Sequence, residues 1–120
     1  MKKVLIVDDE VSVRAFVKRV LAKDYSVVEA GNGEEAVNIA HTAKPDIILM
    51  DIMMPETDGL SACHTIKESY ATRKIPIIML TGVGYDLNRK LSIEIMGADD
   101  YMTKPFSIDE LKEMVARHLK

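Results

Sequence analysis

Three short apolar runs recur along the chain, at residues 4–7, 47–50 and 75–80. Apolar and polar positions do not alternate within these runs, which are rich in Val, Ile and Leu. This pattern is typical of strands that are covered on both faces of a parallel sheet. Residues 25–30 form a weaker candidate strand, and residues 100–103 form a short fifth one.

Helical patterns lie between these candidate strands, because apolar residues recur there with the spacing of one helix face. The apolar positions are Val13, Phe16, Val17, Val20 and Leu21 in the first segment, Ala36, Ile39 and Ala40 in the second, Leu60, Cys63 and Ile66 in the third, Leu87, Leu91 and Ile95 before Gly97 in the fourth, and Leu111, Met114, Val115 and Leu119 in the last. Asn32 before Glu35, and Ser107 before Glu110, have the spacing of helix N-terminal caps.

Strands and helices thus alternate along the whole chain, which predicts an α/β fold. Such alternation gives a parallel sheet with right-handed crossovers and helices on both faces. The 120 residues have the size of one compact domain, and they contain no repeat, linker or low-complexity segment. We therefore expect a single domain over residues 1–120.

Composition narrows the classes of function. The formal net charge of −3 gives no polybasic surface for nucleic acid or membrane. Cys63 is the only cysteine, so an internal disulfide is impossible, which fits a reducing compartment. The apolar run at the start is too short for a signal peptide, and no run is long enough to cross a bilayer. We expect a cytoplasmic protein.

Polar residues follow the candidate strands, at the edge where parallel α/β sheets bind ligands. Asp8 and Asp9 follow the first strand, Asp51 the third, Thr81 the fourth and Lys104 the fifth. Three neighbouring carboxylates repel one another unless cations neutralise them. Lys104 supplies one positive charge, and Mg²⁺ would supply more while leaving positions open for phosphate oxygens. This set favours phosphoryl transfer, with a carboxylate as nucleophile.

Four motifs in this order resemble the response-regulator receiver domain, the phospho-accepting half of two-component signalling. They are VLIVDDE, DIILMDIMMPETDG, IPIIMLTG and GADDYMTKPF. The resemblance covers essentially the whole chain and extends to single-domain receivers of the chemotaxis or relay type. It implies a flavodoxin-like (βα)5 fold, with a five-stranded parallel sheet of order 2-1-3-4-5.

The resemblance also implies a role for each site residue. Asp51 is then the phosphoacceptor. Asp9 binds Mg²⁺ directly, Asp8 binds it mostly through water, and the backbone carbonyl of Met53 completes the protein ligands. Lys104 binds the phosphoryl group.

Further residues serve switching and shape in this family. Thr81 resembles the switch hydroxyl, and Tyr101 resembles the aromatic residue that turns inward on activation. The Lys104–Pro105 peptide bond is expected to be cis. Pro55 and Gly59 would shape the bend after Asp51, through a fixed φ and a close backbone approach.

The implied partners are a sensor histidine kinase or a histidine phosphotransfer protein, and a downstream protein target. The fourth helix, fifth strand and fifth helix would contact that target, and a phosphorylation-dependent homodimer is a further partner. The domain itself would contact neither nucleic acid nor membrane. It would act on no separate substrate and would catalyse only its own phosphorylation and dephosphorylation. Met53 and Val83 carry no acid or amide to orient water, so dephosphorylation should be slow.

Alternative interpretations stay open for several features. Tyr101 also suits static packing, and His41, His64 and His118 are expected on the surface. A Mg²⁺-dependent hydrolase with an aspartyl nucleophile would need D-x-D after the first strand and a cap domain. A nucleotide or flavin module would need a glycine-rich loop there. The domain is either a stand-alone regulator or one part of a longer one.

Overall fold

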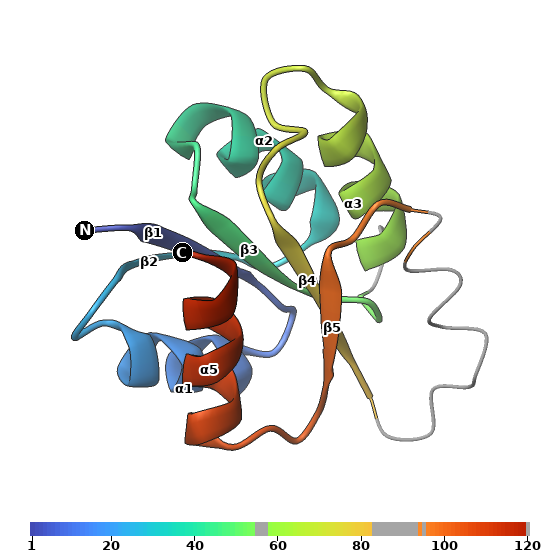
Figure 1. The fold of residues 1–120 in the computed structure, drawn as a ribbon. Helices are drawn as coiled ribbons and strands as arrows, with labels where there is room; N and C mark the ends of the chain where they lie inside the picture. The colour runs from blue at the N-terminus through green and yellow to red at the C-terminus, as the bar shows by residue number, and fades with distance from the viewer. Residues whose placement is uncertain (55–57, 83–93, 95, 120) are drawn as a thin grey trace.

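The computed structural model describes residues 1–54, 58–82, 94 and 96–119. In this part of the chain, five parallel strands form one sheet in the order β2-β1-β3-β4-β5 (Figure 1). The strands are β1 (Lys3–Val7), β2 (Ser26–Ala30), β3 (Ile47–Asp51), β4 (Ile77–Thr81) and β5 (Asp100–Thr103). The predicted fold class and strand order are therefore confirmed.

Helices cover both faces of the sheet (Figure 1). One face carries α1 (Val11–Leu21) and α5 (Ile108–His118), and the other carries α2 (Gly33–Ala43) and α3 (Gly59–Glu68). The expected fourth helix, at residues 87–95, lies almost wholly outside the described residues. Within the described ranges, no helix has both the length and the apolarity to cross a membrane.

Side chains of the central strands alternate between two apolar cores. Leu5 and Ile48 pack on the side of α2 and α3, whereas Ile6 and Leu49 pack on the side of α1 and α5. Because each strand buries both faces, β3 and β4 are buried at every position. The absence of alternation in the sequence follows from this double covering.

Two predicted helix caps form. The Asn32 side chain accepts a hydrogen bond from the backbone N–H of Glu35, and Ser107 and Glu110 cap α5 reciprocally. The Asp58 side chain caps α3 by accepting a hydrogen bond from the backbone N–H of Ser61, which the sequence analysis did not predict. The N-cap residue of α1 is Glu10, whose side chain makes no capping hydrogen bond. Other contacts must therefore hold the turn between β1 and α1.

The burial of Phe16 was not evident from the sequence, and the surface expectation for His118 was wrong. Phe16 belongs to the apolar stripe of α1 but is 37% exposed, and its ring centroid lies 6.1 Å from that of Phe106. It stands at the rim of the core, beside the segment between β5 and α5. His118 is partly buried, with Nε2 3.0 Å from Oδ2 of Asp100, whereas His41 and His64 are exposed.

Candidate functional site

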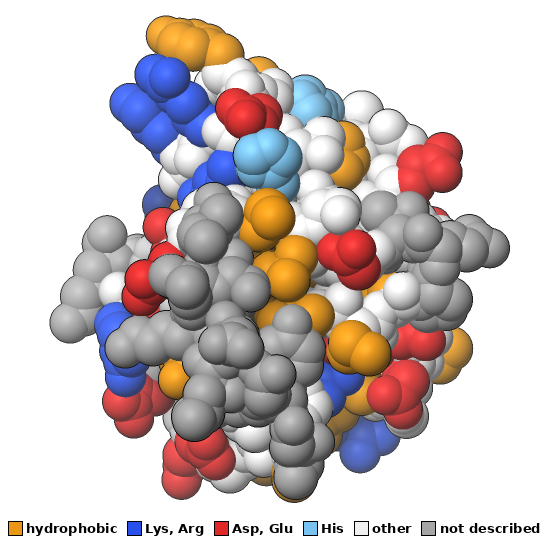
Figure 2. Space-filling model, turned by 90° about the vertical axis from the view of Figure 1, so that its right-hand side faces the viewer, with side chains coloured by type: hydrophobic (Ala, Val, Ile, Leu, Met, Phe, Trp, Pro, Cys, Tyr) orange, Lys and Arg blue, Asp and Glu red, His pale blue; other side chains and the backbone are white. Residues whose placement is uncertain are grey.

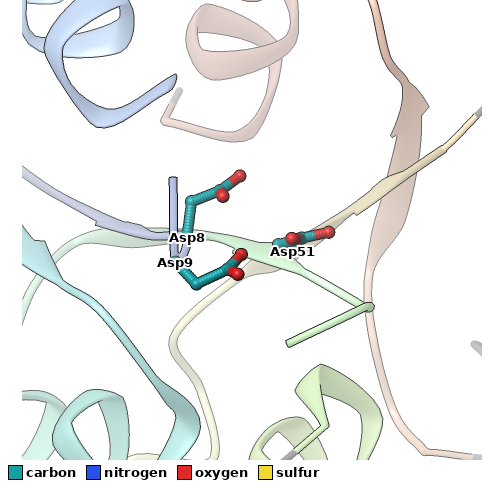
Figure 3. Close-up of side chains that lie close together, drawn as sticks. All are labelled: Asp8, Asp9 and Asp51. Atoms are coloured by element: carbon teal, nitrogen blue, oxygen red, sulfur yellow. The ribbon is translucent and has the colours of Figure 1, made fainter. Parts of the chain in front are cut away.

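Three carboxylates gather at the carboxyl ends of β1 and β3. These strands are parallel neighbours, and Val7 pairs with Met50. Asp8 and Asp9 follow Val7, and Asp51 is the last residue of β3, so their side chains project at one edge (Figure 3). One carboxylate oxygen from each lies within 4.8 Å of the others. Asp8 and Asp51 are buried, whereas Asp9 is exposed.

Lys104 brings a positive charge to this cluster. Its Nζ lies 2.6 Å from Oδ2 of Asp8, 3.5 Å from Oδ2 of Asp51 and 4.0 Å from Oε1 of Glu10. The residue follows β5, so its side chain reaches back past the ends of β4 and β3. The Lys104–Pro105 peptide bond is cis, as the resemblance implied.

Burial and neighbouring charges shift the pKa values of Asp51 and Lys104. Burial, together with the charge of Asp8, raises the pKa of Asp51 to about 6, although Lys104 opposes the rise. Burial alone would lower the pKa of Lys104, but its contacts with Asp8 and Asp51 outweigh that effect and raise it. At neutral pH, Asp51 is therefore mainly ionised and Lys104 is charged.

The backbone after Asp51 folds tightly against it. The N–H of Met53 donates to Oδ1 of Asp51 at 3.2 Å, and the N–H of Gly59 donates to the carbonyl of Ile52 at 2.9 Å. A Cβ on Gly59 would lie 2.1 Å from the carbonyl oxygen of Asp51. Only a residue without a side chain fits there. Pro55 lies outside the described residues.

The two expected switch residues lie on neighbouring strands. Thr81, the last residue of β4, is fully buried, and its hydroxyl donates to that of Thr103 at 3.3 Å. Its carbonyl accepts from the N–H of Lys104 at 2.6 Å. Tyr101 is half-buried on β5 and packs against the core on the side of α2 and α3. Val83 lies outside the described residues.

Arg14 also contacts this edge, although the sequence analysis did not single it out. Its Nη1 donates to the carbonyl of Asp8 at 2.6 Å, and its Nε donates to Oε1 of Glu29 at 3.1 Å. The available signal was an arginine six positions after Asp8, on the helix that follows the acids.

The ligand chemistry of the cluster suits a hard divalent cation. The candidate ligands are carboxylate oxygens, which Mg²⁺ prefers to nitrogen or sulfur. The raised pKa of Asp51 reflects burial and the negative charge of Asp8, both of which disfavour its ionised form. A cation bound among these oxygens would relieve that cost, so the residues present fit Mg²⁺.

Comparisons with known proteins agree with the fold. The family model of the response regulator receiver domain matches residues 4–116. The probable transcriptional regulator ycf27 of Guillardia theta is 44% identical over 120 residues, which cover 99% of this chain and 46% of that protein. The structure of the Vibrio cholerae chemotaxis protein CheY4 aligns with a TM-score of 0.93 and 32% identity over 99% of both chains.

A magnesium-containing structure is also similar. It is the receiver domain of the sensor histidine kinase PA1611 from Pseudomonas aeruginosa PAO1, with a magnesium ion coordinated in its active-site cleft. It aligns with a TM-score of 0.89 and 31% identity, over 98% of this chain and 97% of that one. The chain belongs to the family of response regulator receiver domains. It spans about half the length of the curated relatives it matches.

Proposed function

We propose that residues 1–120 form a receiver domain that accepts a phosphoryl group on Asp51 in a two-component phosphorelay. The donor is a sensor histidine kinase or a histidine phosphotransfer protein. The observation that carries this proposal is the meeting of Asp8, Asp9 and Asp51 with Lys104 at one sheet edge. The domain catalyses only its own phosphorylation and dephosphorylation. A cytoplasmic location, expected from the sequence, belongs to the same proposal.

Magnesium would be held by Asp9 directly, by Asp8 mostly through water, and by Asp51 with the backbone carbonyl of Met53. When bound, Mg²⁺ neutralises charge and orients phosphoryl oxygens. The hydrogen bond from the N–H of Met53 to Oδ1 of Asp51, at 3.2 Å, supports this role because it keeps the Met53 backbone beside Asp51.

Asp51 acts as the nucleophile. One of its oxygens forms a bond to phosphorus while the bond from phosphorus to the donor's histidine nitrogen breaks, and that nitrogen keeps the electron pair. The ammonium group of Lys104 lies 3.5 Å from Asp51 and neutralises the charge that gathers there. A pKa of about 6 leaves Asp51 ionised, and so nucleophilic, at neutral pH.

The phosphodonor would approach beside Lys104. A hollow there is lined by Val13 and Phe16 of α1 and by Pro105 and Phe106 after β5. The exposed ring of Phe16 gives apolar surface next to a charged site. This combination suits a partner that presents an apolar helix face around its phosphohistidine.

The response to phosphorylation would pass through Thr81 and Lys104 to the edge of the sheet. Thr81 would exchange its hydrogen bond with Thr103 for one with a phosphoryl oxygen. Its carbonyl also accepts from the N–H of Lys104, so both residues would move together. Tyr101, half-buried on the neighbouring strand, would then turn inward.

The surface at the β5 edge of the sheet would bind the partner that responds to phosphorylation. Seen from the side of β5, hydrophobic side chains gather in the middle of the surface, with acidic and histidine side chains nearby (Figure 2). Asp100 of the edge strand contacts Arg117 and His118 of α5, at 3.6 and 3.0 Å. A downstream protein, or a second copy in a phosphorylation-dependent homodimer, would bind here. The fourth helix, which belongs to the same proposal, lies almost wholly outside the described residues.

Incubation with acetyl phosphate tests the proposal without knowledge of the donor. The intact mass should increase by one phosphoryl group when Mg²⁺ is present, and should stay unchanged with EDTA. The Asp51→Asn variant, whose side chain has nearly the same shape, should acquire no stable adduct. Continuous release of phosphate without an adduct would favour the hydrolase instead.

A further inference from the structure

The Arg14 side chain joins three elements beside the acidic site. It leaves α1, donates through Nη1 to the backbone carbonyl of Asp8 at 2.6 Å, and donates through Nε to Glu29 of β2 at 3.1 Å. Its side chain is only 18% exposed. A Cβ on Gly31 would lie 3.6 Å from Nη1, so the guanidinium group lies close against the turn after β2.

The segment that Arg14 contacts carries Asp9. Asp8 is held by its own side chain, which accepts hydrogen bonds from the N–H of Glu10 and from Lys104. Within the described part of the chain, by contrast, the Asp9 carboxylate makes no hydrogen bond or ion pair. Its direction therefore depends on the backbone, and the carbonyl held by Arg14 belongs to the Asp8–Asp9 peptide unit.

The chemistry of arginine suits this task. Its guanidinium group is planar and presents several N–H donors in fixed directions, so a partner at one donor fixes the orientation of the others. Glu29 occupies Nε and thereby directs Nη1 toward the carbonyl of Asp8. The contact fixes the peptide just before α1, whose N-cap residue Glu10 makes no capping hydrogen bond through its side chain.

We propose that Arg14 is a positioning residue for Mg²⁺: it orients the Asp8–Asp9 peptide so that the Asp9 carboxylate points toward Asp51. This inference rests on the metal role proposed above for Asp8, Asp9 and Asp51. Arg14 itself contacts neither the metal nor the phosphoryl group.

Electrostatic repulsion alone and a positioning role predict opposite changes in Mg²⁺ affinity when Arg14 is replaced, so a binding measurement distinguishes them. Arg14 is a cation beside a cation site, so removing its charge should strengthen Mg²⁺ binding through loss of repulsion. A positioning role predicts weaker binding, because the peptide that directs the Asp9 side chain toward the site would lose its fixed orientation. Changes to such supporting contacts typically weaken metal binding by about 10–100-fold.

Calorimetric titration of the whole chain with MgCl₂, at constant ionic strength, tests the inference. We expect Arg14→Gln to weaken Mg²⁺ binding about tenfold. Arg14→Lys keeps the positive charge but lacks the planar set of N–H donors, so it should also bind Mg²⁺ more weakly. Lys18→Gln is the matched control, because Lys18 also lies near Glu29, at 3.8 Å, but does not contact Asp8. Its affinity should be unchanged or slightly higher.

Melting temperatures in EDTA and in MgCl₂ separate positioning from stability. A purely structural role would lower both temperatures equally, whereas the proposal requires that the increase caused by Mg²⁺ also shrinks. If Arg14→Gln fails to fold, Arg14→Lys gives the same readout without a change of net charge. Unchanged or tighter Mg²⁺ binding in these variants would overturn the role of Arg14. Absence of binding in the unmodified chain would overturn the metal role on which it rests.

Discussion

Lys104 Nζ lies 2.6 Å from Oδ2 of Asp8, which is 96 positions earlier in the chain. Asp8 is fully buried and Lys104 is 19% exposed at its side chain, so this ion pair is largely shielded from water. The pair holds the segment after β5 against the end of β1. It also leaves Nζ close enough to Asp51 to balance part of that charge.

Replacing Lys104 by Met should destabilise the metal-free protein by roughly 3 kcal/mol, because a buried carboxylate would lose its cation. Urea unfolding in EDTA measures this change. Lys112→Met, at an exposed position of α5, is the control and should have little effect. The double variant Asp8→Asn with Lys104→Met should recover much of the loss. Equal stability of the Lys104 and Lys112 variants would contradict a stabilising pair.

Asp51→Asn should stabilise the metal-free protein at neutral pH. The pKa of Asp51 rises from 3.8 to about 6 on folding, so the folded state binds more protons between these values. Stability contributed by neutral Asp51 is therefore present at low pH and is lost as pH rises through about 6.

Denaturation curves in EDTA at two pH values measure this effect. The gain from Asp51→Asn should be about 2 to 3 kcal/mol near pH 7.5 and about 1 kcal/mol near pH 4.5. Asp24→Asn removes the same charge at an exposed position and should show neither the gain nor its pH dependence. A gain that is the same at both pH values would show that ionisation of Asp51 is not its cause.

Gly59→Ala should destabilise the fold by about 3 kcal/mol or more, because the new Cβ would overlap the carbonyl of Asp51. The sign is informative, since Ala ordinarily stabilises a helix relative to Gly. Gly82→Ala is the matched control, because no atom of the described residues, its chain neighbours aside, lies within 4 Å of its would-be Cβ. Thermal melting of both variants compares them directly, and similar melting points would refute the close contact.

Met53→Asn should shorten the lifetime of the phosphoryl group several-fold, because an amide beside Asp51 can orient a water molecule. Met53 is 67% exposed, so this change should leave stability nearly unaltered. Loss of the phosphoryl mass with time, after removal of the donor, gives the rate. Met53→Leu should keep the slow rate of the parent chain, and a parent half-life of only seconds would contradict the expectation.

Features governed by local pattern were predictable from the sequence. The doubly covered strands, their order of occurrence and the caps at Asn32 and Ser107 follow from apolar spacing and short-range hydrogen bonds. The position of Asp51 at a strand end also follows, because parallel strands end at a common edge. The strand order itself came from the family resemblance.

Features set by tertiary packing were not predictable in this way. The helical stripe that includes Phe16 does not reveal that this residue is partly exposed, with its ring against that of Phe106. His118 is partly buried because α5 packs across β5 and brings it to Asp100. Arg14 contacts both Asp8 and Glu29 only because β1 and β2 are neighbours in the sheet. The spacing of residues along the sequence does not by itself show which strands are neighbours.

Chemical mapping of the acyl phosphate tests the central claim most directly. After incubation with acetyl phosphate and Mg²⁺, borohydride reduction converts a phosphorylated aspartate into homoserine, and peptide sequencing by mass spectrometry locates it. The proposed function predicts homoserine at position 51 and at no other aspartate. Homoserine at position 8 or 9, with Asp51 unmodified, would contradict it.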